Sequence, residues 1–210
     1  EAIDNACDHC KLGYIPEPWK QRVAAACAGW QRSHYGWDVD PSIIRVVPDV
    51  LEAYELFLRE LVGAGNSVIV PTPAYMPFLS VPKLYDVDVI EIGMLQSGDA
   101  ETGEAQWVFD FDAIERAFAA GCHAFVLCNP HNPIGKVLTL EEELRLSDLA
   151  AQYDVRIFND EIHAPFVFEG KHIPFPTISE QAALQSMTAT SASKSFNIPG
   201  TKCAQGLLTN

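Results

Sequence analysis

Apolar residues at helical spacing alternate along the chain with short, continuous apolar runs. In the segment DVLEAYELFLRELVGAG, residues 49–65, apolar side chains recur at helical spacing at Val50, Tyr54, Phe57, Leu58 and Leu61. The segment closes on glycines, which commonly end helices. The pattern therefore predicts an amphipathic helix that buries these five side chains.

The rest of the chain continues this alternation. Thr139 and Glu142 have the spacing of a capping box at a helix start. Short apolar runs that alternate with longer helical patterns are typical of a parallel sheet covered on both faces. The sequence predicts an α/β fold with three αβα layers and a mainly parallel sheet, with strands at 67–73, 86–92, 122–130, 155–161 and 186–192, further helices at 111–121 and 139–154, and an acidic loop at 96–106.

Composition and charge narrow the possible partners. The chain has 210 residues, of which 48% are hydrophobic, and this is enough for a sizeable core. Its formal net charge of -14 argues against nucleic acid or an anionic membrane surface as a partner, because both attract excess Lys and Arg. No apolar run approaches the roughly 20 residues that span a bilayer, and the acidic opening EAIDNACDHC is unlike a signal peptide.

The cysteines favour a reducing compartment over a metal site. Cys7 and Cys10 have metal-ligand spacing, but a zinc site would need a second Cys or His pair, which the sequence does not offer at a fixed spacing. Cys122 and Cys128 bracket an apolar run, where thiols behave as small hydrophobic groups. We therefore expect no metal and a cytoplasmic location.

Polar residues gather where the predicted strands end, at the edge of such sheets where ligands bind. We expect neighbouring residues to point to opposite faces, so that Glu161 points away from the side chain of Asp160. His131 and His172 have no supporting context and are expected at the surface. The residues placed at the strand ends are Asn129, Asn132, Asp160, Glu161, Ser191, Ser193 and Lys194.

An amine, a carboxylate and an amide at one sheet edge match three groups on the ring of pyridoxal phosphate. A desolvated lysine is nucleophilic enough to form a Schiff base with an aldehyde. A carboxylate could hold a ring nitrogen protonated, and an Asn amide could donate to a phenolic oxygen. The helix start at 49–51, with Ser191 and Lys202, could hold the phosphate.

Three motifs, in this order, carry a resemblance to a known family. They are NPHNPIGKV at 129–137, NDEIH at 159–163 and SASKSFNIPG at 191–200. The chain resembles the large domain of fold-type I pyridoxal-phosphate enzymes, in the aminotransferase class I/II superfamily and its cystathionine beta-lyase branch. The similarity extends from LGYIPEP at 12–18 through VVPDVLEA and PTPAYMPF to the end of the chain. It implies an N-terminal segment and helix at 1–40, a cofactor-binding large domain at 41–210, and a small C-terminal domain missing after Asn210.

The resemblance implies roles around the cofactor ring. Lys194 would form the Schiff base and later move the substrate's alpha proton. Asp160 would pair with the pyridine nitrogen, and Asn132 would donate to the ring hydroxyl. Tyr75 would stack on one face of the ring and Ile162 on the other. His163 stands where many aminotransferases have tyrosine, and this is the form familiar from the lyase branch.

The resemblance also implies a phosphate site and a homodimer with shared active sites. Tyr14 corresponds to a tyrosine that reaches the phosphate of the partner subunit. Asp49 stands where relatives usually have glycine, and its carboxylate would repel a phosphate unless it points away. The arginine that grips the substrate carboxylate in relatives is expected outside this chain. The phosphate would be bound by the backbone N–H groups of Val50 and Leu51, by Ser191 or Ser193, and by Lys202.

The resemblance implies a pyridoxal-phosphate-dependent carbon-sulfur beta-lyase of amino-acid biosynthesis. It would act on cystathionine or related S-substituted cysteines and give a thiol, pyruvate and ammonia. A pyridoxal-phosphate-dependent aminotransferase is the alternative, and a non-catalytic regulatory or binding role is a third. A nucleotide-binding domain is disfavoured because no G-x-G-x-x-G or G-x-x-x-x-G-K-[ST] motif follows a strand.

Overall fold

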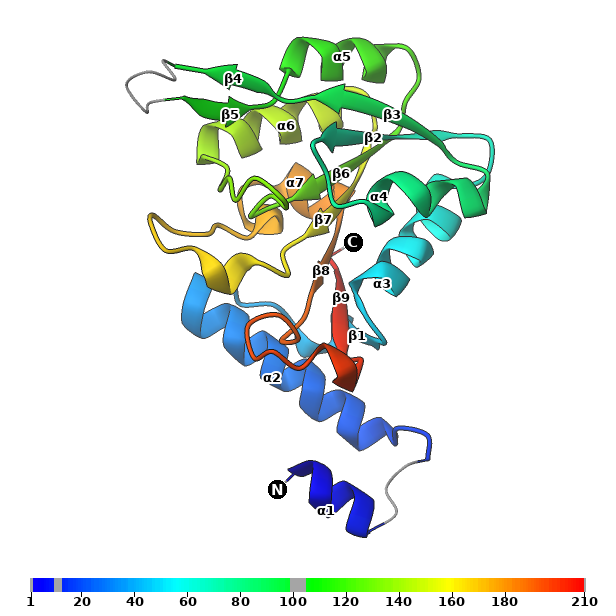
Figure 1. Cartoon of the computed structure of the whole chain (residues 1–210), viewed down its shortest axis with the longest axis vertical. Helices are drawn as coiled ribbons and strands as arrows, with labels where there is room; N and C mark the ends of the chain where they lie inside the picture. Colours follow the sequence, from blue (N-terminus) through cyan, green and yellow to red (C-terminus); the bar gives the residue numbers. More distant parts are fainter. Residues whose placement is uncertain (1, 10–12, 99–104, 210) are drawn as a thin grey trace.

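A seven-stranded sheet organises the chain, with strand order β1-β9-β8-β7-β6-β2-β3 (Figure 1). The computed structural model describes residues 2–9, 13–98 and 105–209. All pairs from β8 to β3 are parallel, and β9 alone runs antiparallel to its neighbours β8 and β1. The predicted mainly parallel sheet is therefore confirmed. The strands are β1 (Ile44–Val47), β2 (Ser67–Thr72), β3 (Asp88–Gly93), β6 (Ala124–Cys128), β7 (Arg156–Asp160), β8 (Ser186–Thr190) and β9 (Ala204–Leu208).

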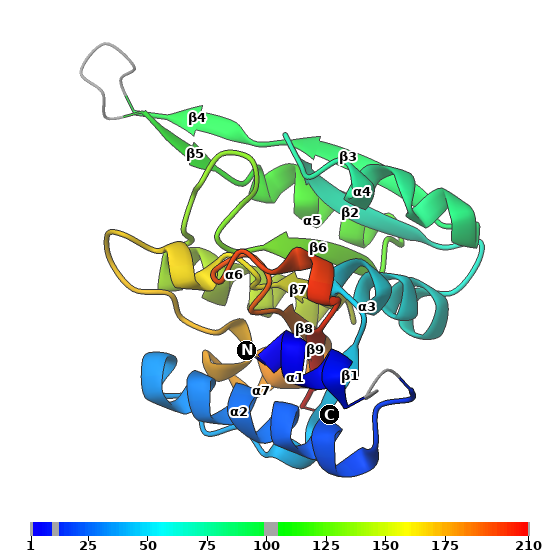
Figure 2. The same cartoon turned by 60° about the horizontal axis from the view of Figure 1, so that its bottom comes forward.

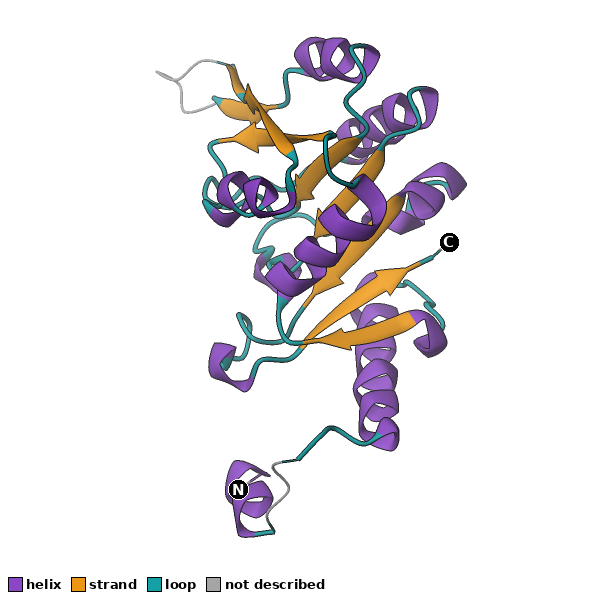
Figure 3. Ribbon diagram, turned by 90° about the vertical axis from the view of Figure 1, so that its right-hand side faces the viewer, coloured by secondary structure: helices purple, strands orange, loops and turns teal. Residues whose placement is uncertain are grey.

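Helices cover both faces of this sheet (Figure 3). Helices α3 and α4 pack on one face, whereas α5, α6 and α7 pack on the other. Helix α2 covers the β1–β9 end, where Ala24 and Ala28 contact Ile44 and Leu207 (Figure 2). The helices are α1 (Ala2–Asp8), α2 (Glu17–Tyr35), α3 (Val50–Phe57), α4 (Pro77–Ser80), α5 (Phe111–Ala119), α6 (Leu140–Gln152) and α7 (Glu180–Gln185).

Strand β6 shows why a strand in this sheet reads as a continuous apolar run. Ala124, Val126 and Cys128 lie in the core beneath α3, and Phe125 and Leu127 lie in the core beneath α5 and α6. Successive side chains point to opposite faces, and both faces are buried. Cys128 and Cys122 are buried free thiols, as the sequence predicts.

The predicted helix at 49–65 is right at its start and wrong near its end. Val50, Tyr54, Phe57 and Leu58 are buried, but Leu61 is 42% exposed. After Phe57 the helix widens into a π-helical turn, Leu58–Val62 (η2), in which the Gly63 N–H donates to the carbonyl of Leu58. The wider turn holds more residues than an α-helical turn, so it shifts the helical spacing and brings Leu61 to the surface.

The segment at 96–106, predicted as a loop, has strand residues at both of its ends. Strands β4 (Leu95–Ser97) and β5 (Gln106–Val108) pair as an antiparallel ribbon. Only the middle of the predicted loop, residues 99–104, lies outside the described residues. The predicted capping box of α6 is confirmed, because the Thr139 hydroxyl accepts from the Glu142 N–H and the Glu142 carboxylate accepts from the Thr139 N–H.

Candidate active site

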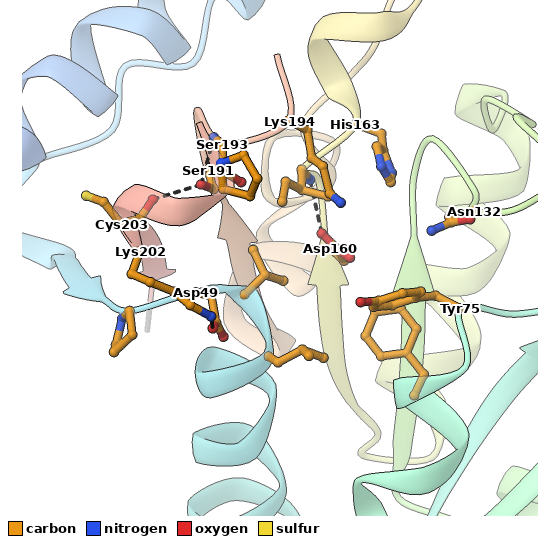
Figure 4. A pocket seen from close by; sticks show the side chains of 16 residues that line it. Asp49, Tyr75, Asn132, Asp160, His163, Ser191, Ser193, Lys194, Lys202 and Cys203 are labelled. Carbon is orange, nitrogen blue, oxygen red and sulfur yellow. Dashed lines mark hydrogen bonds and ion pairs between the residues drawn. The ribbon is translucent and has the colours of Figure 1, made fainter. Parts of the chain in front are cut away.

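The strand register brings the three predicted strand ends to one level. Cys128 of β6 pairs with Asp160 of β7, and Asp160 pairs with Ala189 of β8. A pocket of about 190 Å³ opens beyond these ends (Figure 4). Every residue that the sequence assigns to the cofactor lines this pocket except Tyr14: Val50, Leu51, Tyr75, Asn132, Asp160, Ile162, His163, Ser191, Ser193, Lys194 and Lys202.

Asp160 is the buried charge at the centre of the pocket. Its side chain lies at the carboxyl end of β7, is 5% exposed, and accepts a hydrogen bond from the Ile162 N–H at 3.0 Å. The pKa of Asp160 is raised to about 7, mainly by burial; the charge of Glu161 adds to this rise, whereas the hydrogen bond from Ile162 and the charge of Lys194 oppose it. The carboxylate is thus costly to ionise here, and a cation placed beside it would relieve that cost.

Lys194 lies in the turn that follows β8. Backbone hydrogen bonds from Phe196 to Ala192 and from Ile198 to Ser193 hold the turn. In Figure 4 the side chains of Lys194 and Asp160 face the same space as Asn132 and His163. The predicted Schiff-base role supposes that Lys194 is desolvated, but its side chain is exposed in this chain. Phe196, two positions later in the same turn, is exposed as well, since the turn lies outside the packed layers.

Aromatic and apolar side chains border the Asp160 end of the pocket. Tyr75 is 39% exposed and its ring meets Phe78 edge-on, with 5.6 Å between ring centroids. Ile162 is buried beside the strand end. Burial and the nearby charge of Lys194 lower the pKa of His163, so its imidazole is neutral at neutral pH.

The other end of the pocket is built around the start of α3. Val50 and Leu51 are its first two residues, whose N–H groups are among those that no helical carbonyl can satisfy. Lys202 faces them from the turn before β9. The Ser191 hydroxyl is already committed, because it donates to the Cys203 carbonyl at 2.8 Å and accepts from the Ser193 N–H at 3.0 Å. An anion here would meet a helix start, a lysine and the Ser193 hydroxyl.

Asp49 does not turn away from this end. Its carboxylate caps α3 by accepting from the Glu52 N–H, and its second oxygen lies 2.8 Å from Lys202 Nζ. The sequence raises the question of repulsion but gives no sign of this ion pair, because the two residues are 153 positions apart. Four further residues line the pocket and are not predicted from the sequence: Pro48, Phe78, Pro199 and Cys203. Of these only Phe78 carries a signal, since it follows Tyr75 by one helical turn.

Two predicted features lie outside the pocket. Tyr14 is fully exposed and does not line it. Arginine is absent from its lining, since Arg45 and Arg156 lie in β1 and at the start of β7 and the other arginines lie in helical segments away from the pocket. The pocket therefore offers no bidentate partner for a substrate carboxylate.

A buried polar network lies on the opposite side of β7. Glu161 points away from Asp160, as predicted, and accepts from Asn159 Nδ2 and the Phe175 N–H. His172 Nε2 lies 3.2 Å from the other Glu161 oxygen. His172 and His131 are buried, so the prediction that both are surface residues is wrong. His131 is 3% exposed, and its ring Nε2 lies 2.9 Å from the Pro73 carbonyl oxygen.

Glu143 of α6 belongs to the same side of the sheet and is also buried. One of its oxygens accepts from Asn129 Nδ2 at 2.6 Å, and the other has no hydrogen-bond partner. Burial, with the charge of Glu161 second, raises the pKa of Glu143 to about 8. Asn129 in turn accepts from the Leu138 N–H, so it serves the loop rather than the pocket.

Replacing Glu143 by glutamine is expected to change how stability depends on pH. The Glu143 pKa rises from an ordinary value of 4.5 in the unfolded chain to about 8 in the fold, so the folded state binds more protons between these values. Wild-type stability should therefore fall as pH rises through this window. Glu143→Gln mimics the protonated acid and should be more stable than wild type at pH 8.5 by about 1–4 kcal/mol.

Urea unfolding at pH 5, 7 and 8.5 measures this difference. The matched control is Glu141→Gln, an exposed position on the same helix. The control should shift stability by the same small amount at every pH. A Glu143→Gln curve parallel to wild type across the window would show that Glu143 does not hold its proton in the fold.

Metal and membrane features are also defined by the structure. Across residues 2–9, 13–98 and 105–209, it shows no group of three or more His, Cys, Asp or Glu side chains that could hold a metal ion. Cys10, one member of the Cys7 and Cys10 pair, lies outside the described residues. Within the same ranges no helix is long and apolar enough to cross a membrane.

The chain has a mainly parallel sheet, and the carboxyl edge of this sheet presents an amine, a carboxylate and an amide beside a helix start. This arrangement defines the large domain of a fold-type I enzyme. The chain belongs to the aminotransferase class I and II family, whose model matches residues 13–209.

Relatives place it near the predicted branch of that family. The cystathionine beta-lyase of Corynebacterium glutamicum is 38% identical over 210 residues, which are 100% of this chain and 53% of the relative. A solved structure from Corynebacterium diphtheriae, provisionally assigned as a PLP-dependent beta-cystathionase, has a TM-score of 0.88 at 36% identity and covers 100% of this chain and 52% of its own. Cystalysin from Treponema denticola, which contains pyridoxal 5'-phosphate, has a TM-score of 0.88 at 28% identity over 99% of this chain and 51% of its own. The chain thus spans about half the length of these relatives.

Proposed function

We propose that this chain is the cofactor-binding large domain of a pyridoxal-phosphate-dependent carbon-sulfur beta-lyase. The observation that carries the proposal is the meeting of Lys194, Asp160 and Asn132 in one pocket that ends at the start of α3. The substrate would be cystathionine or a related S-substituted cysteine, and the products a thiol, pyruvate and ammonia. The similarity to the cystathionine beta-lyase of Corynebacterium glutamicum supports this choice of reaction.

The residues present fit the cofactor in chemistry and arrangement. A primary amine, Lys194, would take the aldehyde, and a buried carboxylate with a raised pKa, Asp160, would take a protonated ring nitrogen. Asn132 would donate to the ring oxygen. Tyr75 and Ile162 supply flat and apolar surface for the ring faces, and the start of α3 with Lys202 would meet the phosphate.

Each side chain then has a defined task. The bound cofactor supplies an electron sink for the substrate's alpha carbon. Lys194 Nζ would hold the cofactor and, when free, would take the substrate's alpha proton. Asp160 keeps a proton on the ring nitrogen through charge. Neutral His163 borders the same space and can accept a hydrogen bond from the substrate or hold its orientation.

An aminotransferase is the second candidate, because the family that matches residues 13–209 is named for that activity. The two reactions share the removal of the alpha proton and differ afterwards. In a lyase reaction the substrate loses its thiol from the beta carbon, whereas in an aminotransferase reaction the substrate keeps the sulfur and gives up its amino group. The residues of this pocket would serve the removal of the alpha proton equally well in both reactions.

Product analysis separates these candidates. The longest chain that the gene encodes is incubated with pyridoxal phosphate and cystathionine, and pyruvate, ammonia and free thiol are measured. We expect the three in equal amounts. Formation of a keto acid that keeps the sulfur, dependent on an added amino-group acceptor, would make the protein an aminotransferase. A bound cofactor without either product would support a regulatory or binding role.

We also propose a homodimer in the cytoplasm, with the cofactor's phosphate contacted by Tyr14 of the other copy. The full exposure of Tyr14, away from its own pocket, supports this assignment. The five cysteines that the structure describes are all free, and this supports a reducing compartment. Tyr14→Phe should weaken cofactor binding in a dimer and leave sedimentation unchanged. Equal affinity for pyridoxal phosphate in wild type and variant would contradict the role of Tyr14.

The domain assignment leads to a further prediction. We propose that residues 41–210 form the cofactor domain and that the substrate's carboxylate is gripped by an arginine outside residues 1–210. Residues 1–210 on their own should bind pyridoxal phosphate weakly and release no measurable pyruvate, because positioning is a large part of catalysis. Turnover by residues 1–210 that equals turnover by the longest encoded chain would contradict this assignment.

A further inference from the structure

The phosphate end of the pocket contains a carboxylate of its own. Asp49 accepts from the Glu52 N–H at 2.9 Å with one oxygen and contacts Lys202 Nζ at 2.8 Å with the other. Both residues line the pocket beside Val50 and Leu51, whose N–H groups begin α3 (Figure 4). Lys202, which faces this helix start, is therefore already paired with a carboxylate.

The charges at this end cancel. Among the residues that line the pocket, Asp49 and Lys202 are the charged side chains beside the helix start, and Asp160 and Lys194 lie at the other end. The Ser191 hydroxyl is committed to the Cys203 carbonyl and the Ser193 N–H. A phosphate would meet the partial charge of the helix start, one free hydroxyl and a lysine whose charge is already balanced.

We infer that Asp49 competes with the phosphate dianion for Lys202 and thereby weakens phosphate binding at the start of α3. It does so by holding the lysine that the phosphate needs and by repelling the phosphate directly. The inference rests on the proposed function, because the anion is the phosphate of pyridoxal phosphate. It predicts a site that binds its cofactor less tightly than the same pocket without the carboxylate.

Asp49 cannot easily leave the site. As the N-cap of α3 it is fixed by the hydrogen bond from Glu52 and has extended backbone angles. The hydrogen bond from Lys202 is the main cause that lowers the Asp49 pKa, so the carboxylate stays charged at neutral pH. An incoming phosphate therefore meets the negative charge of Asp49, because the carboxylate is not protonated at neutral pH.

The opposite role for Asp49 makes an opposite prediction. If the carboxylate served to orient Lys202 toward the phosphate, its loss would weaken cofactor binding. If it competes for Lys202, its loss would tighten binding. The sign of the change in the dissociation constant therefore decides between the two roles.

The test variant is Asp49→Asn, because Asn caps a helix as well as Asp and carries no charge. Pyridoxal phosphate is titrated into the longest chain that the gene encodes, and binding is followed by absorbance and protein fluorescence. We expect the dissociation constant to fall about fivefold at low ionic strength, the size of one unit-charge interaction across a wet site. Inorganic phosphate should also compete more strongly in the variant.

The matched control is Asp110→Asn. Asp110 caps α5 by accepting from the Ala113 N–H at 2.8 Å and does not line the pocket. Its variant should bind pyridoxal phosphate as wild type does. Asp49→Ser, which also caps a helix, gives a second test if the asparagine variant folds poorly.

A double-mutant cycle tests the competition for Lys202 directly. Lys202→Met should weaken binding more in the Asp49→Asn background than in wild type, since only there is the lysine free for the phosphate. Binding by Asp49→Asn should also depend more steeply on salt. Unchanged or weaker binding in both the Asn and Ser variants would overturn the inference.

The outcome for the proposed function is read separately. Borohydride reduction followed by peptide mass analysis shows whether pyridoxal phosphate is attached to Lys194 in wild type. An adduct at Lys194 with equal dissociation constants would overturn the role of Asp49 and leave the proposed function standing. Absence of any binding in wild type and variants would overturn both.

Discussion

Lys194→Ala is expected to abolish covalent attachment of pyridoxal phosphate. Lys194 is the lysine whose side chain faces Asp160 and Asn132 in the pocket, whereas Lys202 is paired with Asp49 at the other end. Loss of Nζ removes both the group that holds the aldehyde and the base for the alpha proton. We expect turnover to fall by about 10²- to 10⁴-fold from the lost base alone.

The primary measurement does not depend on turnover. Wild type and variant are incubated with pyridoxal phosphate, reduced with borohydride and analysed by peptide mass spectrometry. We expect a pyridoxyl group on Lys194 in wild type and none at any lysine of the pocket in the variant. Because Lys194 lies in an exposed turn, circular dichroism and melting should be unchanged. Lys171→Ala, at an exposed position outside this pocket, is the control and should keep the adduct.

A variant with the adduct moved to Lys202 and with wild-type turnover would refute the assignment of Lys194. Such a result would require Lys202 to leave its ion pair with Asp49. The two lysines are therefore distinguishable by which one carries the label and by whether turnover survives.

Asp160→Asn is expected to have opposite effects on the empty and the loaded protein. The folded pKa of Asp160, about 7, lies above its ordinary value of 3.8, so the carboxylate costs stability as pH rises between these values. Asparagine removes this cost and can still accept from the Ile162 N–H. The variant without cofactor should therefore be more stable than wild type, by a smaller margin at pH 5 than at pH 8.

With cofactor the sign reverses. A protonated ring nitrogen would lose its buried partner, at a cost of about 3–5 kcal/mol, which corresponds to about 10²- to 10⁴-fold weaker binding of pyridoxal phosphate. Exchange of the substrate's alpha proton should slow as well, because an unprotonated ring is a poorer electron sink. Cofactor titration, proton exchange followed by NMR, and melting at both pH values measure the three effects.

Asp148→Asn, an exposed position on α6, is the matched control and should change none of them. An Asp160→Asn variant that loses stability without cofactor would show that the carboxylate supports the fold. Unchanged proton exchange in the variant would show that the carboxylate does not face the ring nitrogen.

The two ends of the pocket differ in how their charged side chains are paired. The site holds two lysines and two aspartates, but one pair, Asp49 and Lys202, is closed in the structure, whereas Asp160 is buried with a raised pKa. The buried carboxyl group with the raised pKa thus lies where a ring would be held, and the paired charges lie where a phosphate would be held. We expect strong recognition of the ring and modest recognition of the phosphate.

Local and periodic features of this protein were determined by the sequence alone. The order of strands and helices follows from hydrophobic spacing, because each element buries one face or both faces in the same layered core. The capping box at Thr139 follows from two side chains three positions apart. The convergence of Asn132, Asp160 and Lys194 also follows, since parallel strands end at the same edge.

Only the tertiary structure decided which distant side chains meet and how deeply they are buried. No local pattern marks the π-helical turn that exposes Leu61, or the burial of His131 and His172. The pairing of Asp49 with Lys202 joins residues 153 positions apart, and the raised pKa of Asp160 depends on the packing around β7. Hydrophobic spacing is a property of neighbours along the chain, whereas burial and ion pairing are set by groups that only the folded chain brings together.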